Sequence, residues 1–442
     1  MKVTANKKNT VSERSRRYDS YKDSGVEWLR DIPEHWEIRK LKSFLEVFGR
    51  IGFRGYTTND LVDEGSGAIT ISPSNFGESN LEWTKNSYLS WDKYYESPEI
   101  MVEVGDLLIV KTASIGKIAH VRELPEKATV NPQILVVKNV KADNRFLFYQ
   151  FLSIVFQTQL MKEKIGSTIY TISENKILNG FALLPPLPEQ TAIAQFLDDK
   201  TTKIDQAIAI KQQQIALLKE RKQILIHKAV TKGVTSSAVE MKDSGVEWIG
   251  EIPEHWEVKR LKFVTKLISE KILSKDSSLN YIGMENIESW SGKFIESDSE
   301  TEGLANYFEK SDILFGKLRP YLAKVYLAKN KGICTTEFLV YRTSESMSNL
   351  YTHLLMLSFE FINLIDSSTY GSKMPRANSD FIGNQLIPIP PLSEQKEIAN
   401  YIETASSKIE TAISLKEQEI SKLQEYKSSL INSVVTGKVR VC

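Results

Sequence analysis

Two loops at corresponding places in the two halves of the chain carry side chains suited to molecular recognition. The first, 111–117, reads Lys-Thr-Ala-Ser-Ile-Gly-Lys, and the second, 316–324, reads Gly-Lys-Leu-Arg-Pro-Tyr-Leu-Ala-Lys. A second pair of polar loops lies at 166–173 and 371–378. Guanidinium, amide, hydroxyl and aromatic groups of this kind can contact phosphates and the edges of nucleic-acid bases. A lone basic loop is often only a solvated strand connection, but here the equivalent loops of both halves are basic or polar.

The motifs that would support catalysis are missing. An adenine methyltransferase needs an Asn-Pro-Pro-Tyr/Phe loop, and the nearest segment, 131–134, reads Asn-Pro-Gln-Ile, without the second proline or the aromatic ring. No glycine-rich loop ending in Gly-Lys-Ser/Thr is present to bind ATP. His35 and His255 each stand between Glu and Trp without a spaced set of metal ligands. We therefore expect no active site, and we expect these blocks to pack through their tryptophans, Trp28, Trp36, Trp248 and Trp256.

The elements that position these loops belong to a tandem duplication. The block 22–37, with its Lys-Asp-Ser-Gly-Val-Glu-Trp and Ile-Pro-Glu-His-Trp-Glu sequences, returns at 242–257. The proline-rich block 184–190 returns at 389–395. The segments between them, 45–183 and 265–388, show little similarity to each other. The pattern indicates one scaffold that carries two different modules.

Each proline-rich block opens a long segment without proline or glycine, from Glu189 to about Val230 and from Glu394 to about Val435. Apolar residues recur in both at the heptad spacing of a coiled coil. The same positions of the two seams are interrupted by lysines, which are Lys211 and Lys222 in the first and Lys416 and Lys427 in the second. We predict two antiparallel helices that pair with each other, with the polar seam residues fixing the register. The alternative is that each helix packs only on its own module.

Both modules are predicted to be α+β. Short apolar runs bounded by glycines, such as Leu107–Val110 and Ile313–Phe315, indicate strands. One helix is expected to follow the strands in each module, over about 144–163 and 350–365.

Composition limits the remaining possibilities. The 442 residues have a formal charge of +1, so any affinity for nucleic acid must come from local clusters of basic residues. Two cysteines, Cys334 and Cys442, offer neither a disulfide framework nor a zinc site, and no apolar run is long enough to span a bilayer. A cytoplasmic protein is expected.

Taken in their order and with their duplication, these motifs make the chain resemble the specificity subunit of type I restriction-modification enzymes. The resemblance covers nearly everything after the leader. It implies two target-recognition domains that each read one half of a bipartite, asymmetric site in double-stranded DNA. It also implies that the conserved helices set the spacing and dock two methyltransferase subunits, and that two restriction/translocase subunits join the complex. S-adenosylmethionine, ATP and magnesium are expected on those partners and not on this non-catalytic chain.

The expected fold is α+β, with two globular domains separated by two long helices that form an antiparallel coiled coil. The expected boundaries are a basic, disordered leader at 1–20, recognition domains at 21–183 and 236–388, and spacer helices at 184–235 and 389–442. The residues predicted to contact DNA are Lys111, Ser114, Lys117, Thr168, Tyr170, Ser173, Lys317, Arg319, Tyr321, Lys324, Lys373 and Arg376. Two other functions remain open: a two-lobed protein-interaction scaffold without DNA binding, and an enzyme whose motifs are not recognisable.

Overall fold

The computed structural model of the protein describes residues 17–26, 29–50, 52, 55–77, 80–165, 170–234, 239–297, 303–371 and 373–442. Three predictions fall at least partly outside these residues: the disordered leader over positions 1–16, the packing of Trp28, and a DNA contact by Thr168.

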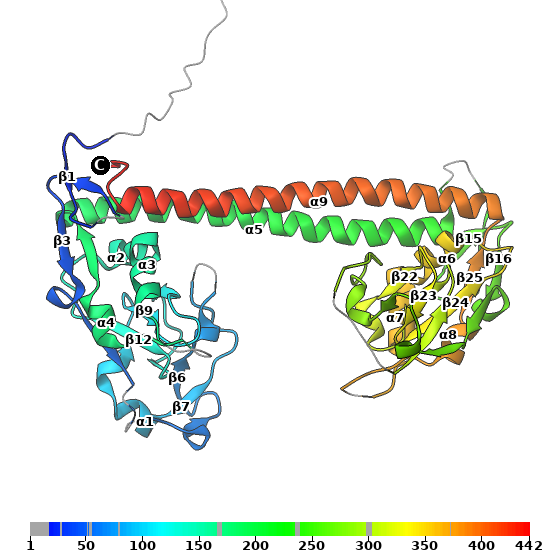
Figure 1. Ribbon diagram of the computed structural model, residues 1–442, viewed down its shortest axis with the longest axis horizontal. Helices are drawn as coiled ribbons and strands as arrows, with labels where there is room; N and C mark the ends of the chain where they lie inside the picture. The colour runs from blue at the N-terminus through cyan, green and yellow to red at the C-terminus, as the bar shows by residue number, and fades with distance from the viewer. Residues whose placement is uncertain are drawn as a thin grey trace, which may run out of the picture. The chain divides into compact units, whose positions relative to one another are not determined.

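The chain divides into two compact units, one formed by residues up to 210 with 418–442, the other by residues 211–417. Each unit contains one module and one end of both long helices, α5 (Leu187–Lys232) and α9 (Leu392–Val435) (Figure 1). Both predicted helices are therefore confirmed. Within the described residues, no helix combines the length and apolar character needed to cross a membrane.

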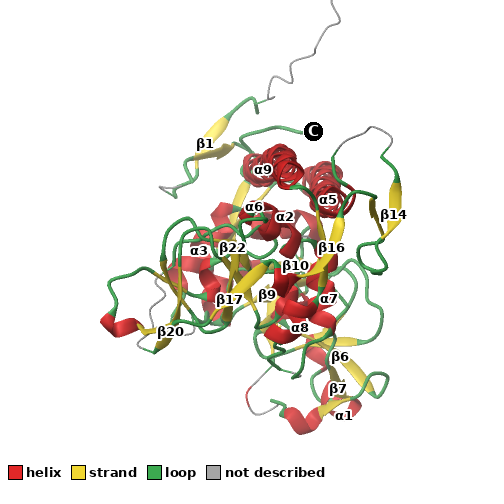
Figure 2. Cartoon of the chain, turned by 90° about the vertical axis from the view of Figure 1, so that its right-hand side faces the viewer, coloured by secondary structure: helices red, strands yellow, loops and turns green. Residues whose placement is uncertain are grey.

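The first module is built from two sheets. The antiparallel sheet β10–β9–β12–β4 is formed by Ile118–His120, Leu107–Val110, Ile134–Lys138 and Glu46–Gly49. The sheet β5–β7–β6–β11–β8 is formed by Leu61–Val62, Tyr88–Ser90, Gly67–Ile71, Ala128–Val130 and Met101–Val102. In the second sheet β6 and β11 are parallel. The short helix α1 (Trp91–Tyr95) lies against β6 and β7 (Figure 2).

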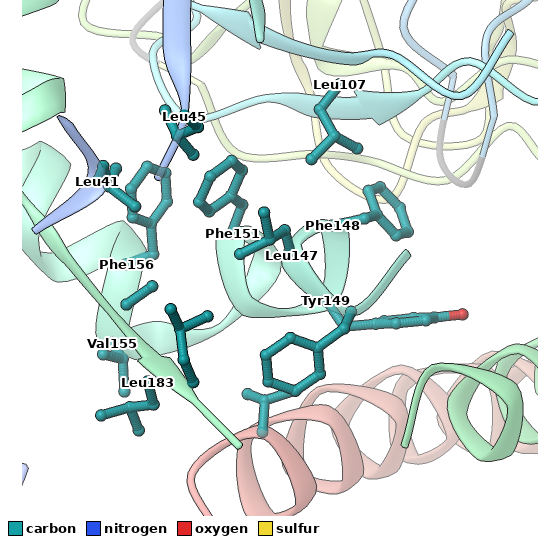
Figure 3. Packing of buried hydrophobic residues seen from close by; sticks show 14 of the residues in the cluster. Leu41, Leu45, Leu107, Leu147, Phe148, Tyr149, Phe151, Val155, Phe156 and Leu183 are labelled. Carbon is teal, nitrogen blue, oxygen red and sulfur yellow. The ribbon is translucent and has the colours of Figure 1, made fainter. Parts of the chain in front are cut away.

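Strand β9 contributes to two separate cores, because successive side chains of a strand point to opposite faces. Leu107 and Ile109 pack on the side of helices α2 (Asn144–Leu152) and α3 (Ile154–Glu163). Leu108 and Val110 pack on the other side, against the second sheet. Figure 3 shows Leu107 pointing toward α2. The sheet therefore forms the middle layer of the module, and the end of β9 delivers the loop that begins at Lys111.

The second module repeats this plan. Its sheet β17–β24–β21–β22 is formed by Thr265–Ile268, Phe338–Thr343, Ile313–Gly316 and Val325–Leu327. Its sheet β18–β20–β23–β19 is formed by Lys271–Leu273, Leu304–Phe308, Gly332–Cys334 and Tyr281–Ile282, with β19 and β23 parallel. Along β21, Ile313 and Phe315 face the helical core while Leu314 faces the other sheet. Both modules are α+β, as predicted.

The single helix predicted over about 144–163 and over about 350–365 is wrong, because the structure divides each of these segments into two helices. In the first, α2 ends at Leu152 and α3 begins at Ile154; in the second, α6 spans Asn349–Met356 and α7 spans Phe359–Ser367. A buried serine with an extended backbone, Ser153 or Ser358, stands at each break. Its hydroxyl donates a hydrogen bond to the carbonyl three residues earlier, at 2.6 Å and 2.7 Å respectively. The amide of the same serine also donates to that carbonyl, at 3.0 Å and 3.1 Å respectively, so both groups close the last turn before the chain changes direction.

Smaller elements close each module onto its long helix. A hairpin begins each repeat, β1 (Tyr21–Asp23) with β2 (Asp31–Pro33) and β14 (Met241–Asp243) with β15 (Glu251–Pro253). The next strands, β3 (Glu37–Lys40) and β16 (Glu257–Arg260), pair with β13 (Phe181–Leu184) and β25 (Leu386–Ile389). The remaining short helices are α4 (Glu174–Asn179) and α8 (Ser379–Asn384). Because β13 and β25 run directly into α5 and α9, these strand pairs bring the two kinds of repeated block together.

The two long helices pair antiparallel in both units. In the first unit, Lys427 of α9 forms an ion pair with Asp205 of α5 at 2.6 Å. In the second unit, Lys222 of α5 forms an ion pair with Glu410 of α9 at 2.8 Å. The two ion pairs correspond in the repeat, because Lys222 of α5 occupies the position of Lys427 of α9, and Asp205 of α5 occupies the position of Glu410 of α9. Lysines in an apolar seam fix the register when each meets an acid on the other helix, and these two lysines do so.

Candidate nucleic-acid interface

In the second module the two predicted loops form one surface, joined by backbone hydrogen bonds. The Arg319 amide donates to the Pro375 carbonyl at 2.7 Å, and the Ala377 amide donates to the Lys317 carbonyl at 2.9 Å. Arg376 and Tyr370 form a bridge that closes the second loop on itself. The loops are therefore held by main-chain pairing and not only by their side chains.

The first module builds the same surface from different residues. The Ala113 amide donates to the Tyr170 carbonyl at 2.9 Å, and the Ile172 amide donates to the Lys111 carbonyl at 2.9 Å. Thr171 forms the closing bridge with Ile165. These bonds make Lys111 the counterpart of Lys317, and Thr171 the counterpart of Arg376.

A third segment, which was not predicted from the sequence, completes the surface of each module. The Lys111 amide donates to the Gln133 carbonyl at 2.8 Å, and the Lys317 amide donates to the Glu337 carbonyl at 2.9 Å. Gln133 and Glu337 therefore occupy the same position. From the sequence, Asn131 to Ile134 was compared only with a methyltransferase loop, whose second proline and aromatic residue it lacks. The sequence carried no direct signal for this segment, because it joins the surface only through the pairing of β12 with β9 and of β24 with β21.

Both surfaces contain a non-glycine residue with a left-handed backbone at the same place. Ala113 has φ 62°, and its counterpart Arg319 has φ 51°; Ala323, at the end of the same loop in the second module, has φ 48°. This conformation costs roughly 1–2 kcal/mol in a residue with a Cβ, and such residues concentrate at functional sites. The common frame carries Ala in one module and Arg in the other, so its shape is kept while its chemistry changes.

Several of the predicted cations are engaged within the protein. The Lys111 ammonium lies 3.1 Å from Glu174, and the Arg376 guanidinium lies 2.9 Å from Glu337. The hydrogen bond to Glu337 raises the pKa of Arg376. Lys324 donates to the Met284 carbonyl at 2.7 Å, and its partial burial lowers its pKa. These contacts with groups of the same module restrict the positions that the three positively charged side chains can take.

The other predicted residues lie at the surface of the same loops. Tyr321 and Tyr170 are 45% and 40% exposed, and the ammonium of Lys164 lies 4.3 Å from the ring centre of Tyr170. Arg319 is half-buried and donates to the Lys373 carbonyl at 3.4 Å. Lys317 is half-buried, and four further residues are exposed: Ser114, Lys117, Ser173 and Lys373. The described members of the predicted set thus fall on one three-segment surface in each module.

The repeated histidines take part in a structural contact. Glu189, in the first turn of α5, accepts hydrogen bonds from His35 at 2.7 Å, from the indole of Trp36 at 3.2 Å and from Tyr18 at 2.6 Å. Burial and this carboxylate raise the pKa of Tyr18, so its hydroxyl remains a donor. Glu394 accepts from His255 and Trp256 in the same way, at 2.8 and 2.9 Å. No group of three or more metal-ligating side chains occurs among the residues that the structure describes.

Comparisons with known proteins agree with this geometry. The family model described as "Type I restriction modification DNA specificity domain" matches residues 33–220 and again 253–423. The type I restriction enzyme MjaVIII specificity subunit of Methanocaldococcus jannaschii is 26% identical, over 93% of this chain and 94% of the relative. The type I restriction enzyme EcoDI specificity subunit of Escherichia coli is 23% identical over 62% of this chain and 66% of the relative.

Solved structures show the same fold. A chain from the structure that describes complex assembly and conformational transition of the type I R-M system aligns with a TM-score of 0.64 at 14% identity, covering 92% of this chain and 99% of that one. The HsdS subunit from Thermoanaerobacter tengcongensis aligns with a TM-score of 0.50 at 14% identity, covering 94% and 100%.

Proposed function

The chain belongs to the family of type I restriction-modification DNA specificity proteins, and from this premise we propose that each module reads one half of a bipartite, asymmetric DNA site. One observation supports this most directly: the two modules share a three-segment backbone frame, but its side chains differ. Ala113 stands where the other module has Arg319, and Thr171 where it has Arg376. Base edges are distinguished by side-chain donors and acceptors, so different side chains on one frame select different sequences.

The repeated blocks and the long helices are surfaces that suit a partner present in two copies. The repeated blocks and the seam positions of the paired helices recur in both halves, and two like scaffolds suit two copies of one partner. We assign them to two methyltransferase subunits, with two restriction/translocase subunits completing the complex. S-adenosylmethionine, ATP and magnesium belong on those partners, because the sequence has neither a methyltransferase loop nor an ATP-binding loop. This chain acts in the cytoplasm, on double-stranded DNA, without catalysing a reaction itself.

Two measurements test this function. Methylome sequencing of a host that expresses the chain with its methyltransferase should reveal one methylated motif with two specified halves and an unspecified gap. Purified chain alone, given S-adenosylmethionine and that DNA, should transfer no methyl groups. Methyl transfer by the isolated chain would show that it is itself an enzyme. If the chain instead showed no salt-dependent affinity for DNA, a protein-interaction scaffold would be the better account of its function.

A further inference from the structure

The arginine of the second surface is held by an acid from the third segment. Arg376 donates from Nη2 to Glu337 Oε1 at 2.9 Å and from Nε to Glu337 Oε2 at 3.1 Å. A guanidinium held through two nitrogens keeps a fixed plane as well as a fixed position. The Arg376 side chain is nevertheless 37% exposed, so part of it still faces outward.

The acid occurs only where the arginine occurs. In the first module Glu337 is replaced by Gln133, and Arg376 is replaced by the uncharged Thr171. The Gln133 side chain accepts a hydrogen bond from the side chain of Asn131, two residues earlier in the same turn. The turn itself does not depend on the acid, because both modules build it with the same backbone bonds: Ile134 to Asn131 and Phe338 to Thr335. The carboxylate of Glu337 is thus not needed to shape its own segment.

Such a pair has two effects on a surface that meets DNA. Affinity for any DNA sequence comes mainly from cations that neutralise phosphates, and a guanidinium already paired with a carboxylate contributes less to it. A base edge, in contrast, requires donors in a fixed plane, and a side chain already held in place loses less freedom when it binds. The pair therefore favours reading a base over binding a phosphate.

Resting on the proposed function, we propose that Glu337 is a specificity-determining positioning residue of the second module. It holds Arg376 toward a base edge and lowers the affinity of the module for phosphates. It acts through Arg376 and is not itself required to touch the DNA.

The test uses the full chain assembled with its methyltransferase subunits, and fluorescence anisotropy with three duplexes. One carries the complete site, one has the second half scrambled and one has both halves scrambled. Glu337→Gln installs the residue of the first module at nearly unchanged volume. We expect roughly threefold to tenfold tighter binding of the fully scrambled duplex and a salt dependence steeper by about one unit, as for one added phosphate contact. The preference for an intact second half should fall about tenfold, while the preference for the first half stays unchanged.

Two controls separate this effect from a change in net charge or a loss of folding. Glu345→Gln removes the same charge from an exposed position at the far end of β24, and it should leave all three affinities nearly unchanged. The double variant Glu337→Gln with Arg376→Gln should lose the gain on scrambled DNA, because the released cation is gone. A circular dichroism melt checks that each variant is folded.

The outcomes distinguish this inference from the function on which it rests. If the wild-type complex does not discriminate among the duplexes, the proposed function fails. If the wild type discriminates but Glu337→Gln keeps the full preference for the second half, or if Glu345→Gln has the same effects, the role assigned to Glu337 is overturned and the function stands.

Discussion

Trp36 and Glu189, 153 residues apart, are joined by a hydrogen bond from the indole nitrogen to the carboxylate at 3.2 Å. Trp256 and Glu394 form the same bond at 2.9 Å in the other unit. Both tryptophans are fully buried. The bond links the two blocks that the sequence repeats, one at the start of each module and one at the start of each long helix. The two repeated blocks therefore share one structural contact in each unit, because one block supplies its donor and the other its acceptor.

Removing this acceptor should destabilise the first unit. Glu189→Leu leaves the donors of Trp36, His35 and Tyr18 without their partner, and an unpaired donor that is buried costs about 1–3 kcal/mol. We expect the free energy of unfolding in urea to fall by about 2–3 kcal/mol. Glu34→Leu, a neighbouring exposed site, is the control and should change it by less than about 0.5 kcal/mol. Equal losses from both changes would contradict the role of the buried bond.

The seam ion pairs should respond to charge reversal as pairs. Lys427→Glu places two acids together beside the apolar seam and should lower the free energy of unfolding by about 2 kcal/mol, between the values for exposed and buried pairs. Adding Asp205→Lys restores opposite charges and should recover most of the loss, which a double-mutant cycle in urea measures. Lys422→Glu, exposed on the same helix, should have little effect. Additive losses in the double variant would show that the two residues do not interact.

His353 should make the second unit sensitive to acid. Burial lowers its pKa from 6.5 to about 4, and its Nε2 donates to the Val325 carbonyl at 3.1 Å. Between pH 6.5 and 4 the unfolded chain binds a proton that the folded protein does not, so stability falls as pH falls through this window. The slope is up to about 1.4 kcal/mol per pH unit, or about 3 kcal/mol in total. His353→Gln should flatten the profile of unfolding free energy against pH; a profile parallel to the wild type would refute this.

Arg319→Ala should weaken binding at one half of the site only. Its loop belongs to the second surface, and a base-reading contact carries roughly 1–3 kcal/mol, or about fivefold to 150-fold in affinity. Duplexes with one half scrambled at a time measure where the loss falls. Lys329→Ala removes a cation from an exposed turn of the same module and serves as the control. An equal loss at both halves, or no loss, would count against the modular assignment.

Lengthening both long helices equally should lengthen the gap in the recognised sequence. Four residues inserted after Gln213 and four after Gln418 lie midway between the two ion pairs on both helices, so both pairs can still form. They add about one turn and ~6 Å of rise, which corresponds to nearly two base pairs at ~3.4 Å each. Methylome sequencing should then find the same half-sites with a longer gap.

The insertion after Gln213 alone is the comparison variant. It changes the spacing on α5 but not on α9, so it breaks one ion pair and should reduce stability, even though an insertion of nearly one turn keeps much of the apolar seam. An active double insertion with an unchanged gap would mean that the helices do not measure the spacing.

The sequence by itself determined the features that repeat or follow a fixed period. The duplicated blocks predicted two like scaffolds, and the heptad spacing predicted α5 and α9 and their pairing. Seam lysines such as Lys222 predicted a fixed register, because a charged residue in an apolar row needs a partner. The basic and polar loops identified most of each candidate surface, since they lie at corresponding places in the two halves.

Only the tertiary structure decided the features that depend on contacts between distant residues. Ser153 and Ser358 break helices that local propensity would continue, because packing and a bond from each hydroxyl favour the turn. Which acid meets which seam lysine depends on antiparallel pairing across about 200 residues. Glu337 became part of the second surface only when strand pairing placed its turn beside Lys317 and Arg376. A local sequence sets propensities, but neighbours across a sheet are chosen by the fold as a whole.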